Sequence, residues 1–180
     1  MEKPLLILDL DETLIRGQES PLSEGEPHDM LLGPYFVYFR PHARSFLAAM
    51  GEHFRLGFWS SATLSYVGPI CRQLMKGQPE PLFVWGRERC TERFDHFKRE
   101  TYYAKDLRHI EKNGISLARV LIVDDELRKV NRHYGNALIV RPFLGDAADD
   151  ELPKLESFLR SVSQLEDLRR VEKSKWSAGL

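Results

Sequence analysis

Two aspartates separated by one residue, Asp9 and Asp11, directly follow a short apolar run at residues 5–8. If that run is a strand, both carboxyl groups point toward a similar side while Leu10 turns into the core. Such a pair can share the steps of phosphate monoester hydrolysis. Asp9 can attack phosphorus, while Asp11 protonates the leaving oxygen and later deprotonates water. The hydroxyl of Thr13 can hold the loop or bind a phosphate oxygen. The spacing therefore predicts a phosphatase in which Asp9 is phosphorylated during turnover.

A second acidic pair, Asp124 and Asp125, follows another apolar run at residues 121–123. With Asp11 protonated, Asp9 and this pair bring a charge of about −3, and a phosphate dianion adds about −2. At about 4 Å each like-charge contact costs several kcal/mol in a partly dry site, so cations must be present. Oxygen ligands without a matching His or Cys spacing select a hard ion. We therefore predict that Mg²⁺ binds beside these aspartates.

Two basic residues are candidates for part of the remaining charge. Lys105 precedes Asp106, and Arg87 lies earlier in the chain. Once Mg²⁺ is bound, the lysine would bring the net charge of the site to about −2 and the arginine would bring it to about −1. Taken alone, however, Lys105 has a simpler explanation as a solvated lysine, so its place in the series of motifs is what makes it a candidate.

Each of these signals also has an ordinary structural explanation. An Asp-x-Asp pair is often a surface loop or a helix cap, and Asp124-Asp125 can be the N-cap of the helix that follows. Ser60 and Ser61, at the end of a further apolar run, can likewise cap a helix that starts at Ala62. The argument for chemistry depends on order, because the aspartates, the serine, the lysine and the acidic pair follow successive elements of one predicted sheet.

Short apolar runs alternate with helical periods along the chain, and continuous runs of this kind fit strands covered on both faces of a parallel sheet. We expect strands at residues 5–8, 54–59, 82–85, 121–123 and 137–140. Apolar residues at helical spacing predict helices near residues 41–50, 66–74, 107–113 and 152–168. The alternation predicts an α/β fold, a Rossmann-like three-layer sandwich with a central parallel sheet, in which ligands bind at the carboxyl ends of the strands.

The segment 16–35 interrupts this alternation with glycines and prolines among polar residues, which indicates a loop or a small hairpin. Because it leaves directly after the first acidic cluster, we interpret it as a minimal cap, a flap over the site; a passive surface connection is the alternative. We expect one domain over residues 1–172 and a loose tail at residues 173–180.

Composition bounds the function further. The formal net charge is −1, which gives no bulk attraction to nucleic acid or to anionic membranes. No apolar run is long enough to span a bilayer, and the N-terminus does not read as a secretory signal. Cys71 and Cys90 are too few for a disulfide framework. We therefore expect no membrane partner and a cytoplasmic location, or a nuclear one in a eukaryotic cell.

With these residues in place, the sequence resembles the haloacid dehalogenase superfamily, and within it the C-terminal-domain phosphatase, or NLI-interacting-factor-like, branch. The branch's Asp-Leu-Asp-Glu-Thr-Leu stands at residues 9–14, and its Arg-Pro before a helix stands at Arg40-Pro41. Further matches are Trp59-Ser60-Ser61-Ala62 for Phe-Thr-Ala-Ser, Arg87-Glu88-Arg89-Cys90 for Arg-Glu-x-Cys, Tyr103-Ala104-Lys105-Asp106-Leu107 for Tyr-x-Lys-Asp-Leu, and Asp124-Asp125 for the final motif. The likeness extends over residues 5–160.

The resemblance implies a haloacid-dehalogenase-type fold and a role for each matched acidic residue. Asp9 would be the nucleophile and a Mg²⁺ ligand. Asp11 would be the general acid and base, and would bind the metal through its backbone carbonyl. Asp125 would complete the set of metal ligands, while Asp124 would orient Lys105 or a metal-bound water.

The resemblance also implies which residues bind substrate. Ser60 would bind a phosphate oxygen, with Ser61 beside it as a further candidate along with Thr13. Lys105 would bridge the phosphate and the carboxylates, and Arg87 would help to hold the substrate. Ser60 replaces the commoner threonine and keeps the hydroxyl.

Two departures from the branch bear on the substrate. The insert at 16–35 is shorter than the branch's small cap, which contributes a peptide groove, so specificity for a polymerase tail is not carried over. Extra residues between Cys90 and Lys105 interleave basic and aromatic side chains; such a run is usually a solvated loop, but near a site it could grip a phosphorylated polymer.

Because no segment is large enough to enclose a metabolite, we predict phosphoserine or phosphothreonine in protein as the substrate. A phosphatase acting on nucleic-acid ends or small metabolites is the first alternative, and the net charge argues mildly against nucleic acid. A phosphoprotein-binding module without turnover is the second, and the presence of Asp9, Asp11, Lys105 and Asp125 argues against it.

Overall fold

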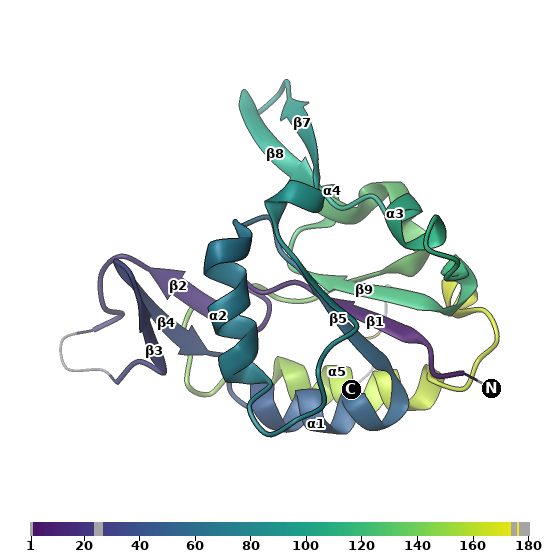
Figure 1. Ribbon diagram of the computed structural model, residues 1–180, viewed down its shortest axis with the longest axis horizontal. Helices are drawn as coiled ribbons and strands as arrows, with labels where there is room; N and C mark the ends of the chain where they lie inside the picture. The colour runs from purple at the N-terminus through teal and green to yellow at the C-terminus, as the bar shows by residue number, and fades with distance from the viewer. Residues whose placement is uncertain (1, 24–26, 174–175, 177–180) are drawn as a thin grey trace.

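The computed structural model describes residues 2–23, 27–173 and 176. At its centre is a sheet of five parallel strands in the order β10-β9-β1-β5-β6 (Figure 1). These strands are β1 (Leu5–Leu8), β5 (Arg55–Trp59), β6 (Phe83–Trp85), β9 (Val120–Asp124) and β10 (Ala137–Ile139). All the strands that the apolar runs predicted are therefore present, in one parallel sheet.

Helices cover both faces of this sheet, which confirms the predicted α/β sandwich. The first face carries α1 (Ala43–His53), α2 (Leu64–Leu74) and α5 (Glu151–Val162), and the second carries α3 (Arg108–Glu111) and α4 (Leu127–Val130) (Figure 1). Alternation along β1 builds both cores, because Leu6 and Leu8 pack in the core under the first face while Leu5 and Ile7 pack under the second. A strand covered on both sides must be apolar at every position, as β1 is.

A small antiparallel sheet stands beside the central one, in the order β2-β4-β3 (Figure 1). Its strands are β2 (Ile15–Gln18), β3 (Met30–Leu32) and β4 (Tyr35–Phe39). The turn between β3 and β4 contains Gly33 at φ +58°, a left-handed conformation that glycine adopts without a steric cost. The segment 16–35 thus contains one tight hairpin, and β2 completes its sheet.

The residues after Cys90 form a second hairpin, of β7 (Thr91–Asp95) and β8 (Glu100–Ala104), which projects from the body of the molecule (Figure 1). This run is a regular hairpin rather than an irregular loop, and most of its side chains are exposed to solvent. The turn closes because Oδ1 of Asp95 accepts hydrogen bonds from the backbone amides of Phe97 and Lys98, at 2.9 and 3.1 Å. Aromatic residues on both strands then favour the extended conformation.

The C-terminal helix is shorter than its apolar stripe predicted. Helix α5 ends at Val162, and Leu165 is 45% exposed, whereas Leu168 is buried in a 3₁₀ turn at Leu168–Arg170. Most of the predicted tail, residues 173–180, lies outside the described residues. Trp176 differs from that expectation, because its side chain is 5% exposed and its indole N–H donates to the carbonyl of Ile139 at 3.1 Å.

One buried ion pair joins the loop after β1 to the segment that precedes α5. Arg40 and Asp149 are both buried and pair through two hydrogen bonds, of 2.7 and 2.8 Å. Arg40 also donates to the backbone carbonyls of Thr13 and Arg141, at 3.0 and 2.9 Å. One guanidinium therefore fixes the loop after β1 against the segment that leads into α5.

Asp149→Asn is expected to lower the free energy of unfolding by about 3 to 5 kcal/mol, because it leaves the buried Arg40 charge without its partner. Burial alone would raise the pKa of Asp149, but Arg40 holds it below the ordinary value. The stabilisation is therefore present above pH about 4 and is lost as the pH falls further. Urea unfolding at neutral and acid pH measures both effects.

The matched control for that measurement is Asp150→Asn, at the neighbouring exposed carboxylate. Its ion pairs with Arg141 and Lys154 lie on the surface, so the unfolding midpoint should hardly move. Equal losses in the two variants would contradict the role assigned to the buried pair.

Candidate active site

The carboxyl ends of three neighbouring strands bring the predicted polar residues together. Asp9 directly follows β1, Ser60 follows β5, and Asp124 is the last residue of β9. The pairing of Leu8 with Val123 continues one step further, because the backbone amide of Asp9 donates to the Val123 carbonyl at 3.0 Å. Side chains far apart in sequence therefore meet at one edge of the sheet.

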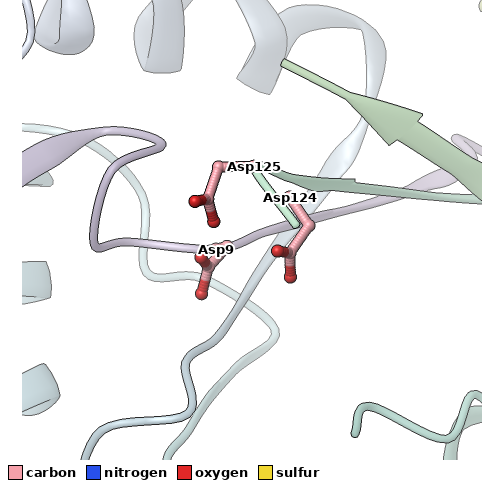
Figure 2. A group of neighbouring side chains, drawn as sticks. All are labelled: Asp9, Asp124 and Asp125. Atoms are coloured by element: carbon pink, nitrogen blue, oxygen red, sulfur yellow. The ribbon is translucent and has the colours of Figure 1, made fainter. Parts of the chain in front are cut away.

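Three carboxylates converge at that edge (Figure 2). Asp9, Asp124 and Asp125 each offer an oxygen, and these oxygens lie within 4.8 Å of one another. Burial raises the pKa of Asp9 although Lys105 opposes the shift, and burial also raises the pKa of Asp125. The three carboxylates are thus partly withdrawn from water, and their all-oxygen donor set fits Mg²⁺.

Lys105 lies inside this cluster rather than in solvent. Its ammonium donates to Asp9 and to Asp124 at 2.6 Å each, and its side chain is fully buried. Burial alone would lower the pKa of Lys105, but the carboxylates of Asp124 and Asp9 raise it above the ordinary value. The lysine is therefore charged and held in place by two hydrogen bonds.

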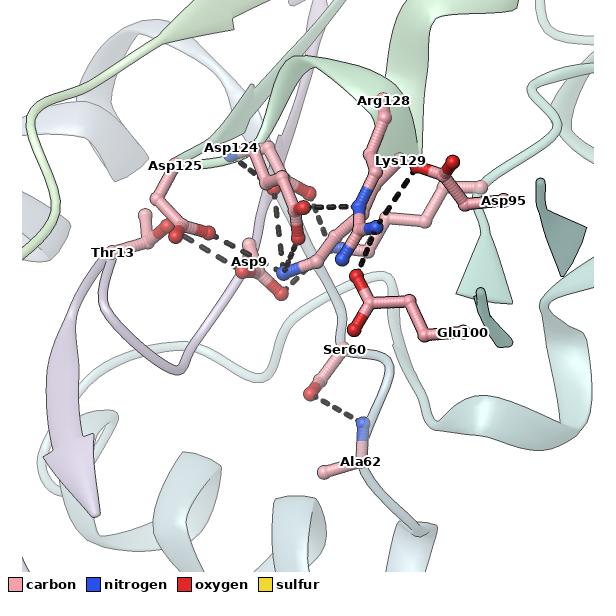
Figure 3. A network of polar contacts seen from close by, with 12 residues as sticks. Asp9, Thr13, Ser60, Ala62, Asp95, Glu100, Asp124, Asp125, Arg128 and Lys129 are labelled. Atoms are coloured by element: carbon pink, nitrogen blue, oxygen red, sulfur yellow. Dashed lines mark hydrogen bonds and ion pairs between the residues drawn. The ribbon is translucent and has the colours of Figure 1, made fainter. Parts of the chain in front are cut away.

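A second lysine, Lys129, stands at the same cluster, and the sequence analysis did not identify it. Its ammonium lies 3.4 Å from Asp125 and 3.8 Å from Asp124 (Figure 3). Burial would lower its pKa, but the surrounding carboxylates raise it. Its position four residues after Asp125, on the helix after the acidic pair, is the signal that could have found it.

Asp11 stands apart from the three converging carboxylates and has a different partner. The hydroxyl of Tyr66 donates to its carboxylate at 2.9 Å. Burial, together with the charge of Asp9, raises the pKa of Asp11 to about 6, while the Tyr66 hydrogen bond opposes the rise. Burial and Asp11 also raise the pKa of Tyr66, so its phenol stays protonated. A carboxyl group of this kind can give up and regain a proton near neutral pH.

The hydroxyl residues of the predicted site play different parts. Thr13 donates to Asp9 at 3.5 Å. The Ser60 oxygen accepts a hydrogen bond from the Ala62 amide at 3.0 Å (Figure 3), but neither serine caps a helix that starts at Ala62, because α2 begins at Leu64 and its N-cap is Thr63. The hydroxyl proton of Ser60 can still donate to a phosphate oxygen. Ser61 contributes its backbone carbonyl, which accepts from Arg87 at 2.8 Å.

A cavity of about 310 Å³ opens beside these groups and is lined by Asp11, Gly17, Tyr35, Ala62, Thr63, Tyr66 and Arg87. The segment 16–35 contributes Gly17 and Tyr35 to its wall. A Cβ at Gly17 would lie 2.1 Å from the Tyr66 hydroxyl, so this position must remain glycine for Tyr66 to reach Asp11. The arrangement thus joins the cluster of carboxylates and lysines to an open cavity through one carboxyl group that can carry a proton.

The sequence matches one family model and several named proteins. A family model described as NLI interacting factor-like phosphatase matches residues 4–169. Nuclear envelope morphology protein 1 of Schizosaccharomyces pombe is 28% identical over 94% of this chain and 35% of its own length. Carboxy-terminal domain RNA polymerase II polypeptide A small phosphatase 1 of Homo sapiens is 29% identical, over 94% of this chain and 63% of its own. The chain therefore spans less than two thirds of either relative.

Solved structures show the same fold. The structure of Fcp1, described as an essential RNA polymerase II CTD phosphatase, matches with a TM-score of 0.60 at 19% identity, over 88% of this chain and 47% of that one. A fission yeast Fcp1 variant bound to beryllium fluoride matches with a TM-score of 0.59 at 17% identity, over 97% of this chain and 55% of that one. Within residues 2–23, 27–173 and 176, we find no helix with the length and apolar character of a membrane span.

Proposed function

The chain belongs to the NLI interacting factor-like phosphatase family, and on that premise we propose that it is a Mg²⁺-dependent phosphatase that works through an aspartyl-phosphate at Asp9. The observation that carries the proposal is that two carboxyl groups of the site have different surroundings. Asp9 is buried beside the Lys105 ammonium, whereas Asp11 faces the open cavity and has a pKa of about 6. One group suits attack on phosphorus, and the other suits proton transfer.

In the first half-reaction, a carboxylate oxygen of Asp9 forms a bond to phosphorus while the bond from phosphorus to the ester oxygen breaks. The leaving oxygen takes the proton of Asp11. The hydroxyl of Tyr66 holds the Asp11 carboxyl group in position through a 2.9 Å hydrogen bond. Lys105 and Lys129 offset the negative charge that gathers as the phosphate approaches the cluster. Mg²⁺, when bound by Asp9, Asp125 and the backbone carbonyl of Asp11, would supply further neutralisation of the phosphate oxygens.

In the second half-reaction, Asp11 takes a proton from water, whose oxygen attacks phosphorus. The bond between phosphorus and the Asp9 oxygen breaks, inorganic phosphate leaves, and both carboxyl groups return to their starting state. Ser60 and Arg87 are the groups that we assign to hold the phosphate and its carrier. Asp124 orients Lys105 through the 2.6 Å hydrogen bond between them.

The substrate that this site suits best is phosphoserine or phosphothreonine in a polypeptide. We assign residues 16–35 as the cap of a single domain, residues 1–172, and that cap contributes only one wall of the cavity. An open cavity admits a phosphorylated side chain on a larger chain, and it offers little to enclose a free metabolite. The named relatives include a phosphatase of a polymerase polypeptide, which agrees with a protein substrate. A cytoplasmic or nuclear location stays a prediction.

A substrate panel tests this proposal. With Mg²⁺ present, kcat/KM for phosphoserine and phosphothreonine peptides is expected to exceed that for sugar phosphates, nucleotides and 3′-phosphorylated oligonucleotides by about tenfold or more. Sugar phosphates and nucleotides are too short to extend along the open site, and the net charge of −1 gives no attraction to the polyanionic backbone of an oligonucleotide. Faster turnover of sugar phosphates or nucleotides than of phosphopeptides would contradict the assignment. Binding of phosphopeptides without release of phosphate would favour the non-catalytic alternative instead.

A further inference from the structure

The β7–β8 arm, residues 91–104, has two chemically different faces. Antiparallel pairing sets Arg93 opposite Tyr102 and Asp95 opposite Glu100. Because side chains alternate along a strand, these four share one face, which we call the inner face. Glu92 and Phe94, with Thr101 and Tyr103 opposite them, share the outer face.

The inner face is attached to the body of the protein by a single arginine of α4. Arg128 pairs with Glu100 at 2.5 Å and with Asp95 at 3.5 Å, and its guanidinium lies 5.1 Å from the ring centre of Tyr102 (Figure 3). Asp95 also accepts the backbone hydrogen bonds that close the turn. The arm is therefore held in one position, although it projects from the body (Figure 1).

The outer face continues the wall of the candidate active site. Arg87 lines the cavity beside Asp11, and its guanidinium lies 4.5 Å from the ring centre of Tyr103. From Tyr103 the same face leads outward past Thr101 and Phe94 to the turn. A polypeptide that enters the cavity can thus run along the arm without leaving the protein surface.

Along this path lie exposed aromatic and cationic side chains, and among the described residues the ring of Phe94 contacts the ring of His96 in the turn, at 5.1 Å between centres. Phe94 is 52% exposed and Phe97, in the turn, is fully exposed at 101%. Lys98 and Arg99 follow in the turn, and among the described residues neither forms an ion pair. The two carboxylates nearest the turn, Asp95 and Glu100, are occupied by Arg128. The free groups near the turn are therefore aromatic and positive.

We infer that the outer face and turn of the β7–β8 arm bind the segment of a phosphorylated polypeptide that flanks the phosphoresidue and carries acidic and apolar side chains. The inference rests on the proposed function and names where its substrate extends. An extended chain advances about 3.3 Å per residue, so the contacts near the turn fall about five residues from the phosphoresidue. Because the arm is already held by Arg128, binding need not order it.

A polypeptide fits this surface better than a nucleic acid does. Glu92 lies on the outer face opposite Tyr103, at the cavity end of the arm, where it would repel a phosphate backbone that runs along the whole strand. The acidic side chains of a peptide need to lie only near the cationic turn. The chain as a whole has a net charge of −1. Aromatic side chains with a few cations suit a mixed acidic and apolar peptide, whereas a continuous polyanion needs a continuous basic groove.

Two double variants test the inference, Phe94→Ser with Phe97→Ser and Lys98→Gln with Arg99→Gln. Their substrates are phosphopeptides with an acidic and apolar flank on either side, the same peptides trimmed to two residues around the phosphoresidue, and p-nitrophenyl phosphate. On a long peptide, we expect KM to rise about tenfold in the phenylalanine variant with kcat within about twofold, because exposed aromatic contacts contribute to binding rather than to chemistry. In the charge variant KM should be about threefold above that of the parent at low salt. The difference should vanish at high salt, because salt screens the cations of the parent.

Trimmed peptides and p-nitrophenyl phosphate cannot reach the turn, so both variants should process them as the parent does. Tyr134→Ser is the matched control, because Tyr134 is also a large exposed aromatic (63%) but lies on the 3₁₀ segment at residues 131–136. It should change none of these values.

The outcomes separate this inference from the proposed function. A parent protein that hydrolyses p-nitrophenyl phosphate and long peptides, but whose arm variants keep the parental KM, overturns the inference and leaves the proposed function intact. A larger rise in KM for a 3′-phosphorylated oligonucleotide than for the peptides overturns it as well. A parent that hydrolyses none of these substrates overturns both.

Discussion

Asp9→Asn is expected to reduce kcat by at least about 10³-fold while the protein remains folded, because an amide cannot attack phosphorus as a carboxylate does. The substitution keeps the size of the side chain. The amide oxygen can still accept the hydrogen bond that Lys105 gives to Asp9 at 2.6 Å. One negative charge also leaves a buried cluster in which the pKa of Asp9 is raised, so folding is not expected to suffer.

Hydrolysis of p-nitrophenyl phosphate and the thermal unfolding midpoint are measured together for this variant. Asp150→Asn, at an exposed aspartate that is not part of the carboxylate cluster, is the control and should keep full activity. Acid quenching of the parent during turnover should also trap a phosphoryl group on the peptide that contains Asp9. A folded Asp9→Asn protein with activity close to the parent would refute the covalent mechanism.

Removal of divalent cations is expected to reduce hydrolysis to the background rate, and excess Mg²⁺ should restore it. The reason lies in the cluster of Asp9, Asp124 and Asp125, whose oxygens lie within 4.8 Å of one another. Lys105 and Lys129 provide two positive charges against these three carboxylates, and a phosphate dianion would add about two more negative charges. Without a further cation the substrate would be repelled.

Calorimetric titration of the protein with Mg²⁺ provides a readout that does not depend on turnover. Asp125→Asn should weaken Mg²⁺ binding by about tenfold or more, because it removes one carboxylate ligand from the set. Since burial raises the pKa of Asp125 and of Asp9, protons compete with the metal, and affinity should fall as the pH is lowered. Activity that survives chelation, with no heat of Mg²⁺ binding, would contradict the metal assignment.

The central sheet could be predicted because its signal is local. A strand covered by helices on both faces must be apolar throughout, so β1, β5, β6, β9 and β10 each appear as a short apolar run. The first acidic residues after β1 and β9 could be placed at the same edge for a similar reason, since parallel strands end together. The predicted residues Asp9, Asp124 and Asp125 accordingly lie in one cluster.

Side chains that depend on a partner from another element were harder to predict. Tyr66 looked like one member of an apolar helix face, and only the packing of α2 beside the cap brings its hydroxyl to Asp11. Lys129 matched none of the motifs, yet it stands beside Asp125. The β7–β8 arm looked like a loop, because its exposed strands lack a buried face and are stabilised by cross-strand pairs and Arg128.

The sequence by itself determined the chemistry that this protein can offer. Asp9, Asp11, Lys105 and the Asp124-Asp125 pair are set by residue type and by their position after apolar runs, and both of these are local properties of the chain. Only the tertiary structure decided the electrostatic state and the surroundings of these groups. The pKa of Asp11, the two hydrogen bonds of Lys105 and the path from Arg87 onto the arm depend on atoms that folding brings together from distant parts of the sequence.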